Sequence, residues 1–466
     1  MTLAWHEPSL QDQAPMPPAA LSFLFVAAVA SLLFATAGGR LHVVLAILAA
    51  AVGYGLFGGM GIAYVARSLG DGLAAGLIGP GLAALTGAVV SLILTRSGGL
   101  ATLSEGVRRR VPPRALSVTT AAVSVVSGIS VSIEGAYALL AAPMAAVARA
   151  GGRCARQGNL RLALTLQAGH GLLWPAPGPV IAATVLAADW RLVLFFGVLA
   201  AVAAALSAAV FTAVARDLSP ARQGDDPPPP GAVDLAQSPR PSLAALPVVV
   251  PLALLLVATL GYFASEPLGG GATRALLLAF GAMPSVFIVA IGLAVAIAAG
   301  HRHHIVGERG WFAMALAEAA PTVFVVCAAI AFARVVQNSA LPDLAGEWLS
   351  TVGAKETGSL APMIVAFGVA AVIRALQGSL LVAMISTAGL MEPLVADASA
   401  VTTALVVVAM GAGASALSHA NDGYFWIVVR SLGLTPVQGY VLLTIGSTVV
   451  ALASLSLLFV LTVTTA

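Results

Sequence analysis

Long apolar segments, separated by short polar ones, follow one another from Leu21 to the end of the chain. Many approach the ~20 residues that an α-helix needs to cross a bilayer. Their apolar residues are continuous, whereas a transmembrane strand alternates apolar with polar residues. We therefore predict an all-α polytopic membrane protein with roughly 12–14 transmembrane segments. The apolar segments from which these are drawn are residues 21–37, 41–58, 72–95, 114–130, 133–149, 162–187, 192–215, 242–264, 274–299, 311–336, 357–374, 379–396, 399–417, a short 423–432 and 437–464.

Composition supports the same class. Hydrophobic residues make up 59% of the 466 positions and charged residues only 9%, against roughly 25% charged in a soluble domain. A net charge of +3 is too small to indicate a nucleic-acid partner. The two cysteines, Cys154 and Cys327, indicate neither a disulfide framework nor a metal site. Residues 1–20 are polar and Pro-rich without a basic region, so we expect no signal peptide.

The chain divides at residues 216–241, which are polar, Pro-rich and charged with both signs, as in a solvated linker. We predict a polar tail at 1–20, a first transmembrane repeat at 21–215 and a second at 242–466. Three features recur in the same order at nearly constant separation, and they pair Ser97 with Ser339, Glu134 with Gln377, and His170 with His419.

Charge indicates how the two repeats are oriented. Residues 96–114 carry five arginines and 149–161 carry four, whereas the matching 338–356 and 392–399 are mainly acidic. Lys and Arg mark cytoplasmic loops. Matching loops should therefore lie on opposite sides of the membrane, which is an inverted-topology repeat. Such transporters bind substrate near the midplane, on helices that are broken there.

Four stretches predict broken or re-entrant helices: 127–135, 169–179, 374–379 and 418–423. Pro175, Pro177 and Pro179 cannot all lie in a regular helix interior. Irregular backbone at membrane depth is tolerated only where protein or a water-filled cavity surrounds it. Helix N-termini at such breaks attract anions. Ser97–Gly99 and Asn338–Ser339 fit either re-entrant tips or ordinary loop turns.

Ionisable residues within these breaks are the candidate functional groups, because charge inside a bilayer is costly and usually functional. His419 alone would fit a core histidine, but Asn421 and Asp422 stand beside it. Glu134 is a lone acid in a Gly/Ser-rich break. Arg374 fits either a substrate-carboxylate partner or a side chain that snorkels from a helix end. His301, His303 and His304 belong to a basic loop, and we predict no metal site.

At these positions the sequence resembles the gluconate:proton symporter (gluconate permease) family. The resemblance lies in GASALSHANDGYFWIVVRSLGLT, IRALQGSLLVAMISTAGL, SIEGAYALLAAPMAAVARA, LTRSGG and GHGLLWPAPGP, and it runs from about Leu41 to the C-terminus outside the linker. It implies a multi-pass inner-membrane symporter for gluconate, a related sugar acid or D-serine, within an ion-transporter superfamily of inverted repeats. Trp174, Leu380 and Leu381 depart from the family pattern, as do the missing aromatic pair before Glu134 and the Gly-Tyr after Asp422. These departures leave the substrate open.

The resulting hypothesis is a proton symporter that imports a small hydroxylated carboxylate such as gluconate. The substrate-binding residues are expected to be Ser418, Asn421, Gln377, Gly378, Ser379, Arg374 and His170. The proton-coupling residues are expected to be Glu134, Asp422 and His419, because burial changes the proton affinity of a carboxylate and histidine titrates near neutral pH. The expected partners are the carboxylate, protons and the bilayer, with room for a homo-oligomer and without nucleic acid or cofactor.

Three other functions remain open at this point. One is a carrier of D-serine or of another small amino or hydroxy acid. A channel is less consistent with inverted repeats and broken helices. A membrane-embedded enzyme is not favoured, because the chain contains no HExxH or GxSxG motif.

Overall fold

A computed structural model describes the protein at residues 17–36, 41–152, 154–215, 238–263, 266–267, 269–298, 300, 302–341 and 360–465. All regular secondary structure in these ranges is helical. Six of the described helical stretches are long and apolar enough to span a membrane, or seven if the bent pair 272–297 counts as one span. The class predicted from the sequence, a polytopic all-α membrane protein, is confirmed. The larger number of expected segments also counts short stretches such as 423–432, which forms a nine-residue helix.

The helices of the first half, in chain order, are α1 Pro18–Thr36, α2 Val43–Phe57, α3 Ile62–Gly76, α4 Leu82–Arg96, α5 Gly99–Arg110, α6 Pro113–Ser127, α7 Ile133–Ala150, α8 Ala155–Leu172, α9 Pro177–Val185 and α10 Trp190–Val214. A π-helical turn at Leu77–Gly81, which contains Pro80, joins α3 to α4 in one continuous span. The predicted segment 162–187 is divided into α8 and α9, because Pro177 begins α9. Proline is well suited to a first helical turn, where its missing N–H has no intrahelical partner to lose.

The described helices of the second half are α11 Pro241–Val257, α12 Ala272–Gly281, α13 Met283–Ile297, α14 Arg302–Val306, α15 Trp311–Gln337, α17 Leu360–Gln377, α18 Leu380–Val395, α19 Ala400–Ala414, α20 Gly423–Ser431, α21 Pro436–Gly439 and α22 Ile445–Thr465. A 3₁₀ turn at Ala258–Tyr262 follows α11, and a π-helical turn at Tyr440–Thr444 precedes α22. Most of the predicted linker, 216–237, and most of the predicted loop 338–356 lie outside the described residues.

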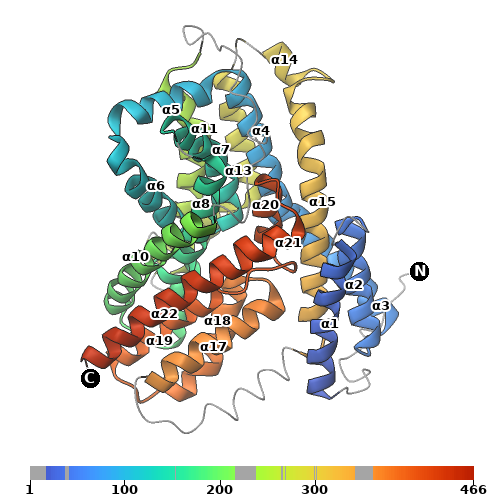
Figure 1. Cartoon of the computed structure of the whole chain (residues 1–466), viewed down its shortest axis with the longest axis vertical. Helices are drawn as coiled ribbons and strands as arrows, with labels where there is room; N and C mark the ends of the chain where they lie inside the picture. The colour runs from blue at the N-terminus through green and yellow to red at the C-terminus, as the bar shows by residue number, and fades with distance from the viewer. Residues whose placement is uncertain are drawn as a thin grey trace.

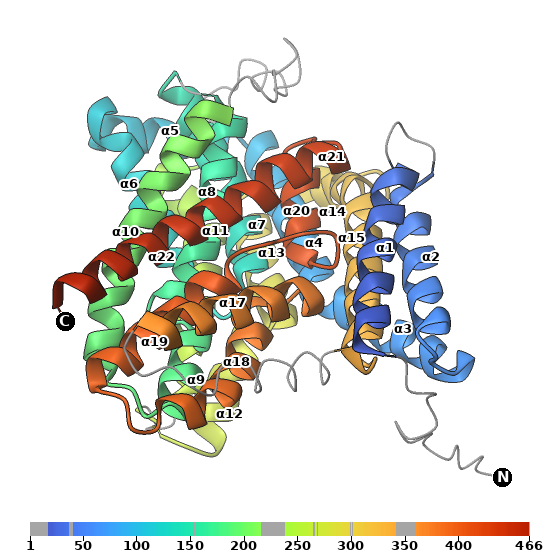
Figure 2. The same ribbon diagram turned by 60° about the horizontal axis from the view of Figure 1, so that its bottom comes forward.

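Helices and breaks occur in the same order in the two halves. The series α4, α6, α7, α8, α9, α10 is matched by α15, α17, α18, α19, α20, α22. Ser132 caps the first turn of α7, and Ser379 caps that of α18. Contacts between the halves are reciprocal, since α9 contacts α18 while α20 contacts α7, and α10 contacts α22 (Figures 1 and 2). This pattern supports a repeat, and its inverted orientation stays a prediction.

The inverted orientation has a direct test. We expect residues 96–114 and 149–161 to lie in the cytoplasm and 338–356 in the periplasm, because arginine-rich loops are retained inside. Single cysteines are placed in each loop of a variant without Cys154 and Cys327 and labelled from outside whole cells. Only the 338–356 cysteine should react before the membrane is permeabilised. Reaction of 96–114 and 338–356 from the same side would exclude the inverted repeat.

The halves meet where α8 contacts α19. A Cβ atom added to Gly411 would lie 1.8 Å from the carbonyl oxygen of Gly171, and one added to Gly171 would lie 2.4 Å from that of Gly411. Only glycine at both positions allows the two backbones to approach this closely. One turn away along the same two helices, Gln167 Nε2 donates to the carbonyl of Ser415, the residue that follows α19, over 2.7 Å. The contact therefore lies beside the breaks that follow both helices.

The N-terminal helices α1 to α3 form a separate layer against α15 (Figure 2). The Tyr54 hydroxyl bonds the Ser339 hydroxyl over 2.9 Å, and Asn338 Nδ2 donates to Ser68 Oγ over 2.9 Å. Asn338 and Ser339 are therefore at the C-terminal end of α15, held by this layer. The matching Ser97 lies in the turn between α4 and α5, where Gly98 has a φ of 77°.

Candidate functional site

Two breaks of the second half, 374–379 and 418–423, form one junction. His419 Nε2 donates to the Ala375 carbonyl over 2.8 Å, and Asn421 Nδ2 donates to the same oxygen over 2.8 Å and to that of Leu376 over 3.1 Å. The last carbonyls of a helix lack intrahelical partners. Side chains from the second break therefore satisfy the end of α17, and the two breaks are held together as one unit.

A buried ion pair lies in this junction. Arg374 Nη2 contacts Asp422 Oδ2, and the two side chains are 2% and 4% exposed. Asp422 Oδ2 also accepts a hydrogen bond from Ser418 Oγ over 2.6 Å, and Oδ1 accepts one from the Tyr424 amide over 2.9 Å at the start of α20. Every contact treats the carboxyl group as an acceptor, the pattern of an ionised carboxylate. We expected Arg374 to bind the substrate and Asp422 to carry the proton. In the structure the two side chains form an ion pair with each other.

Gly378 and Ser379 lie at the start of α18, against the same break. Gly378 has a φ of +66°, and a Cβ atom there would lie 2.2 Å from the carbonyl oxygen of Asn421. Glycine is required on both counts, because other residues rarely adopt this conformation and no side chain fits. Ser379 Oγ accepts from the Val382 amide over 3.4 Å and caps α18. The predicted binding residues of the second half therefore share one site.

Several buried polar atoms at this junction have no protein partner. They are Arg374 Nε, Gln377 Oε1, His419 Nδ1 and Asn421 Oδ1. Buried polar groups in folded proteins almost always have a hydrogen-bond partner. Four exceptions in one place, one of them a guanidinium donor and two of them amide acceptors, indicate a site for a small polar ligand. Gln377 and Ser379 are half-buried, so the site borders accessible space.

Glu134 is the acid that the first half contributes. It lies in the first turn of α7, is half-buried, and accepts a hydrogen bond from Ser132 Oγ over 3.0 Å. α7 packs on α20, whose first turn is capped by Asp422, and the Tyr137 and Tyr424 rings of these helices have centroids 5.8 Å apart. The acid of the first half and the ion pair of the second therefore lie on neighbouring helices, although they come from different halves of the chain.

His170 has the same structural role in the first half that His419 has in the second. Its Nδ1 contacts the carbonyl oxygen of Gly128 over 2.9 Å, at the end of α6. Each histidine thus bonds the carbonyl end of the helix before a break. The break 169–179 was expected to meet 418–423. Its contacts include α6 through His170, α19 through Gly171 and α18 through Gly178, which faces Met384. Aromatic rings stack on Trp174 in the same break.

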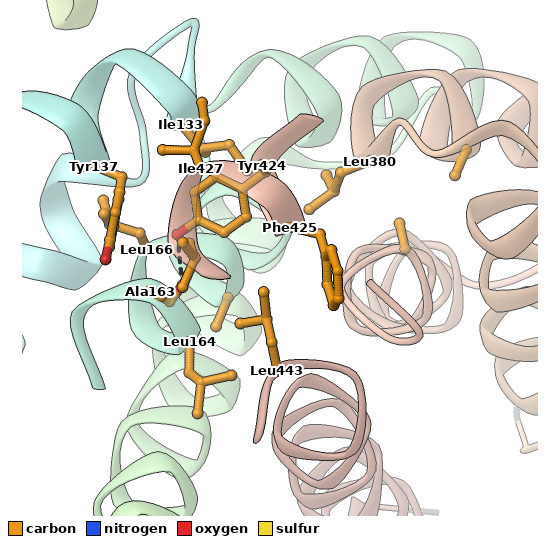
Figure 3. Close-up of a cluster of buried hydrophobic side chains, with 14 of the residues drawn as sticks. Ile133, Tyr137, Ala163, Leu164, Leu166, Leu380, Tyr424, Phe425, Ile427 and Leu443 are labelled. Carbon is orange, nitrogen blue, oxygen red and sulfur yellow. Dashed lines mark hydrogen bonds between the residues drawn. The ribbon is translucent and has the colours of Figure 1, made fainter. Parts of the chain in front are cut away.

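Two tyrosines beside the junction were not among the predicted residues. Tyr424 donates its hydroxyl to the Ala163 carbonyl over 2.8 Å, and the Tyr137 hydroxyl bonds the Ser431 hydroxyl over 2.6 Å. Figure 3 shows both rings in the apolar cluster between α7, α8 and α20. Tyr137 follows Glu134 by one helical turn, and Tyr424 follows Asp422 by two residues. That spacing is the sequence signal that could have found them.

Comparison with known proteins places the chain in a family. A model of the GntP family permease matches residues 20–464. A gluconate permease of Bacillus subtilis is 25% identical, with 92% of this chain and 97% of that protein covered. A gluconate permease of Pseudomonas aeruginosa is 26% identical, covering 91% and 93%. A Gnt-II system L-idonate transporter of Escherichia coli is 24% identical, covering 91% and 93%. The resemblance read from the motifs is confirmed: this multi-pass inner-membrane protein is a member of the GntP permease family.

Proposed function

We propose that this permease imports gluconate or a related sugar acid together with protons. The observation that carries the proposal is the buried Arg374–Asp422 pair, surrounded by unpaired polar atoms where two helix breaks join. The names of the relatives, gluconate permease and L-idonate transporter, support the substrate class.

The arrangement suits a hydroxylated carboxylate. The substrate carboxylate takes the guanidinium of Arg374, whose planar donors match a carboxylate. Gln377 Oε1 and Asn421 Oδ1 are free acceptors and receive hydroxyl hydrogens from the sugar chain. The capped N-terminus of α18, at Gly378–Ser379, adds a positive partial charge beside the carboxylate.

Proton coupling follows from competition for Arg374. A substrate carboxylate can bind Arg374 only when Asp422 releases it, and Asp422 without a partner would be a buried, uncompensated charge. Such a charge is strongly destabilising. Protonation of Asp422 removes that charge, so one proton and one carboxylate enter the site together. Glu134, half-buried on a helix that packs on α20, is the group that exchanges protons with the aqueous side.

Transport by the purified, full-length protein tests the proposal. Proteoliposomes with an alkaline lumen should accumulate radiolabelled gluconate, and dissipating the pH gradient should return the lumenal level to equilibrium. Counterflow, in which unlabelled substrate inside drives uptake of label, should persist without a gradient and separates a carrier from a channel. L-idonate and D-serine are compared in the same assay. Absence of both accumulation and counterflow for sugar acids would refute the proposed substrate class.

Asn421→Ala should weaken substrate binding. The free Oδ1 acceptor is lost, and loss of one hydrogen bond to a buried partner costs about 1–3 kcal/mol, or roughly ten- to hundredfold in affinity. Isothermal titration of gluconate measures the change. Asn159→Ala is the matched control, because Asn159 is also buried with an unpaired Oδ1 but lies in α8, away from the junction. Wild-type affinity in the Asn421 variant would remove that residue from the site.

A further inference from the structure

A cavity with both polar and apolar lining residues lies outside the junction, between α6, α7 and α8. It has a volume of about 80 Å³, enough for several water molecules. Its α6 wall includes three hydroxyl residues, Ser117, Thr120 and Ser124, beside Leu116 and Ala121, and its α8 wall includes Gln157 and Arg161. A guanidinium and a row of hydroxyls are the groups that a hydroxylated carboxylate requires, so the cavity matches the proposed substrate in chemistry.

The hydrogen bonds of Thr120 and Ser124 leave capacity for a ligand. Thr120 Oγ1 donates to the Leu116 carbonyl over 2.8 Å, and Ser124 Oγ donates to the Thr120 carbonyl over 2.7 Å. Both hydroxyl oxygens therefore keep lone pairs that accept hydrogen bonds. Arg161 is half-buried, and among its contacts are those to Thr212 Oγ1 and Ser117 Oγ, which are 3.3 and 3.5 Å long. A carboxylate forms shorter, charge-assisted bonds with guanidinium, so it can displace or join these.

The cavity and the first-half break lie on the same pair of helices. Arg161 and His170 are nine residues apart on α8, or about 13 Å along its axis. Between them α6 and α8 touch backbone to backbone, since a Cβ atom at Gly169 would lie 2.1 Å from the Val125 carbonyl oxygen. The two helices are thus in backbone contact between the cavity and the break, and the cavity lies at the arginine-rich residues 149–161, on the side predicted to be cytoplasmic.

The matching face of the second half is apolar. The capping serines Ser132 and Ser379 are 247 residues apart, a different register from the sequence pairing of Glu134 with Gln377. In this register the three hydroxyl positions of α6 correspond to Ile364, Phe367 and Ala371 of α17. α19, the counterpart of α8, carries no charged residue. It also packs closely on α17, because a Cβ atom at Gly413 would lie 2.1 Å from the Phe367 carbonyl oxygen. The cavity is therefore a feature of the first half that the corresponding helices of the second half do not repeat. A binding site on only one side of the membrane would have this asymmetry.

We propose that this cavity is a second, weaker binding site for the carboxylate end of the transported substrate, on its way between the junction and the cytoplasm. Arg161 holds the carboxylate, and the hydroxyl oxygens of Thr120 and Ser124 accept hydrogens from the substrate's hydroxyl groups. The inference rests on the proposed function for the identity of the ligand.

Cys154 provides a reporter inside the cavity. It lines the wall at the start of α8 and is half-buried. The chain has two cysteines, so Cys327→Ala leaves Cys154 as the single thiol. The rate of its alkylation by N-ethylmaleimide is measured on the purified, full-length protein with gluconate or with sorbitol, which has the hydroxyl groups but no carboxylate. At a gluconate concentration about ten times the Kd, labelling should slow roughly tenfold, and sorbitol should have no effect.

Four further substitutions in this background locate the protection. Arg161→Gln and Thr120→Val should abolish or weaken it, and Thr120→Val keeps the inference testable if Arg161→Gln does not fold. Arg156→Gln, which removes a guanidinium from the same helix outside the cavity lining, should retain it. Asn421→Ala, which is expected to weaken substrate binding at the junction, should also retain the protection of Cys154. Protection that survives both cavity variants, or that Asn421→Ala removes as fully as Arg161→Gln does, overturns the inference.

Uptake of gluconate by the same preparations separates this inference from the proposed function. Transport without protection of Cys154 leaves the function standing and removes the second site. Arg161-dependent protection without transport supports a carboxylate site and refutes the transport proposal. Loss of both refutes both.

Discussion

Asp422→Asn should abolish accumulation of substrate against its gradient while binding and counterflow persist. Asparagine retains the cap on the Tyr424 amide but cannot ionise, so it mimics protonated Asp422. Arg374 is then free for the substrate at every pH. With a pH gradient of about one unit, a one-proton symporter accumulates substrate roughly tenfold, whereas the variant should only equilibrate it. Gluconate affinity should rise as the pH falls in the wild type and be nearly constant in the variant.

The same substitution predicts a stability change that ligand reverses. Removing one partner of a buried ion pair costs about 3–5 kcal/mol, because the other charge stays buried and unpaired. The ligand-free variant should therefore unfold at a lower temperature, and gluconate should stabilise it more than it stabilises the wild type. Asp189→Asn is the matched control, since Asp189 also caps a helix, α10, but is exposed at its start. Accumulation by the Asp422 variant would contradict the coupling scheme.

Glu134→Gln should also abolish uptake driven by a pH gradient, without loss of the fold. Glutamine keeps an acceptor for Ser132 Oγ but cannot carry a proton between the aqueous side and Asp422. Because the variant retains Arg374 and Asp422, it should still bind substrate, and the defect should appear in the rate of coupled uptake. Uptake that still follows an imposed pH gradient would remove Glu134 from the mechanism.

Glu105 is the control for this second prediction. It lies on α5 and forms ion pairs with Arg108 and Arg109. Hydrogen bonds from Arg108 and Arg109 lower the pKa of the Glu105 carboxyl to about 2. A group with this pKa stays ionised throughout the pH range of a transport assay and carries no protons. Glu105→Gln should therefore leave gradient-driven uptake unchanged, which distinguishes a specific loss at Glu134 from a general effect of removing an acid.

Hydrophobicity predicted the membrane class, because it depends on the average of many residues rather than on any contact. Local chemistry predicted where helices break, since proline and glycine act on their own backbone. The hydrophobic pattern predicted a helix less well where one face of the helix is buried and the other carries charged residues. α3 was mostly missed because it carries Arg67 and Asp71, which the structure exposes, while Ser68 and Gly72 are buried toward α15.

Contacts between residues far apart in the chain could not be predicted from the sequence. Arg374 and Asp422 were both identified as candidates, but they are 48 residues apart in separate breaks, and no periodicity indicates that they pair. The same holds for His419 and Asn421, which bond carbonyl groups that every residue possesses. Which carbonyl is left unsatisfied depends on where α17 ends, and the sequence places such ends only to within a few residues. Tertiary packing decides these bonds.

The contact between Gly171 and Gly411 limits how the two halves can move relative to each other. The backbones of the two helices touch at that point, and the side chains of Gln167 and Ser415 form hydrogen bonds across the contact beside it. A rotation there therefore disturbs few side-chain contacts. The two helices also have no space left between them, so they cannot be pushed closer. The contact therefore has the mechanical properties of a fulcrum: it resists compression and permits tilting. A small tilt there would be magnified with distance along α8 and α19, opening one end of the helix pair as the other closes.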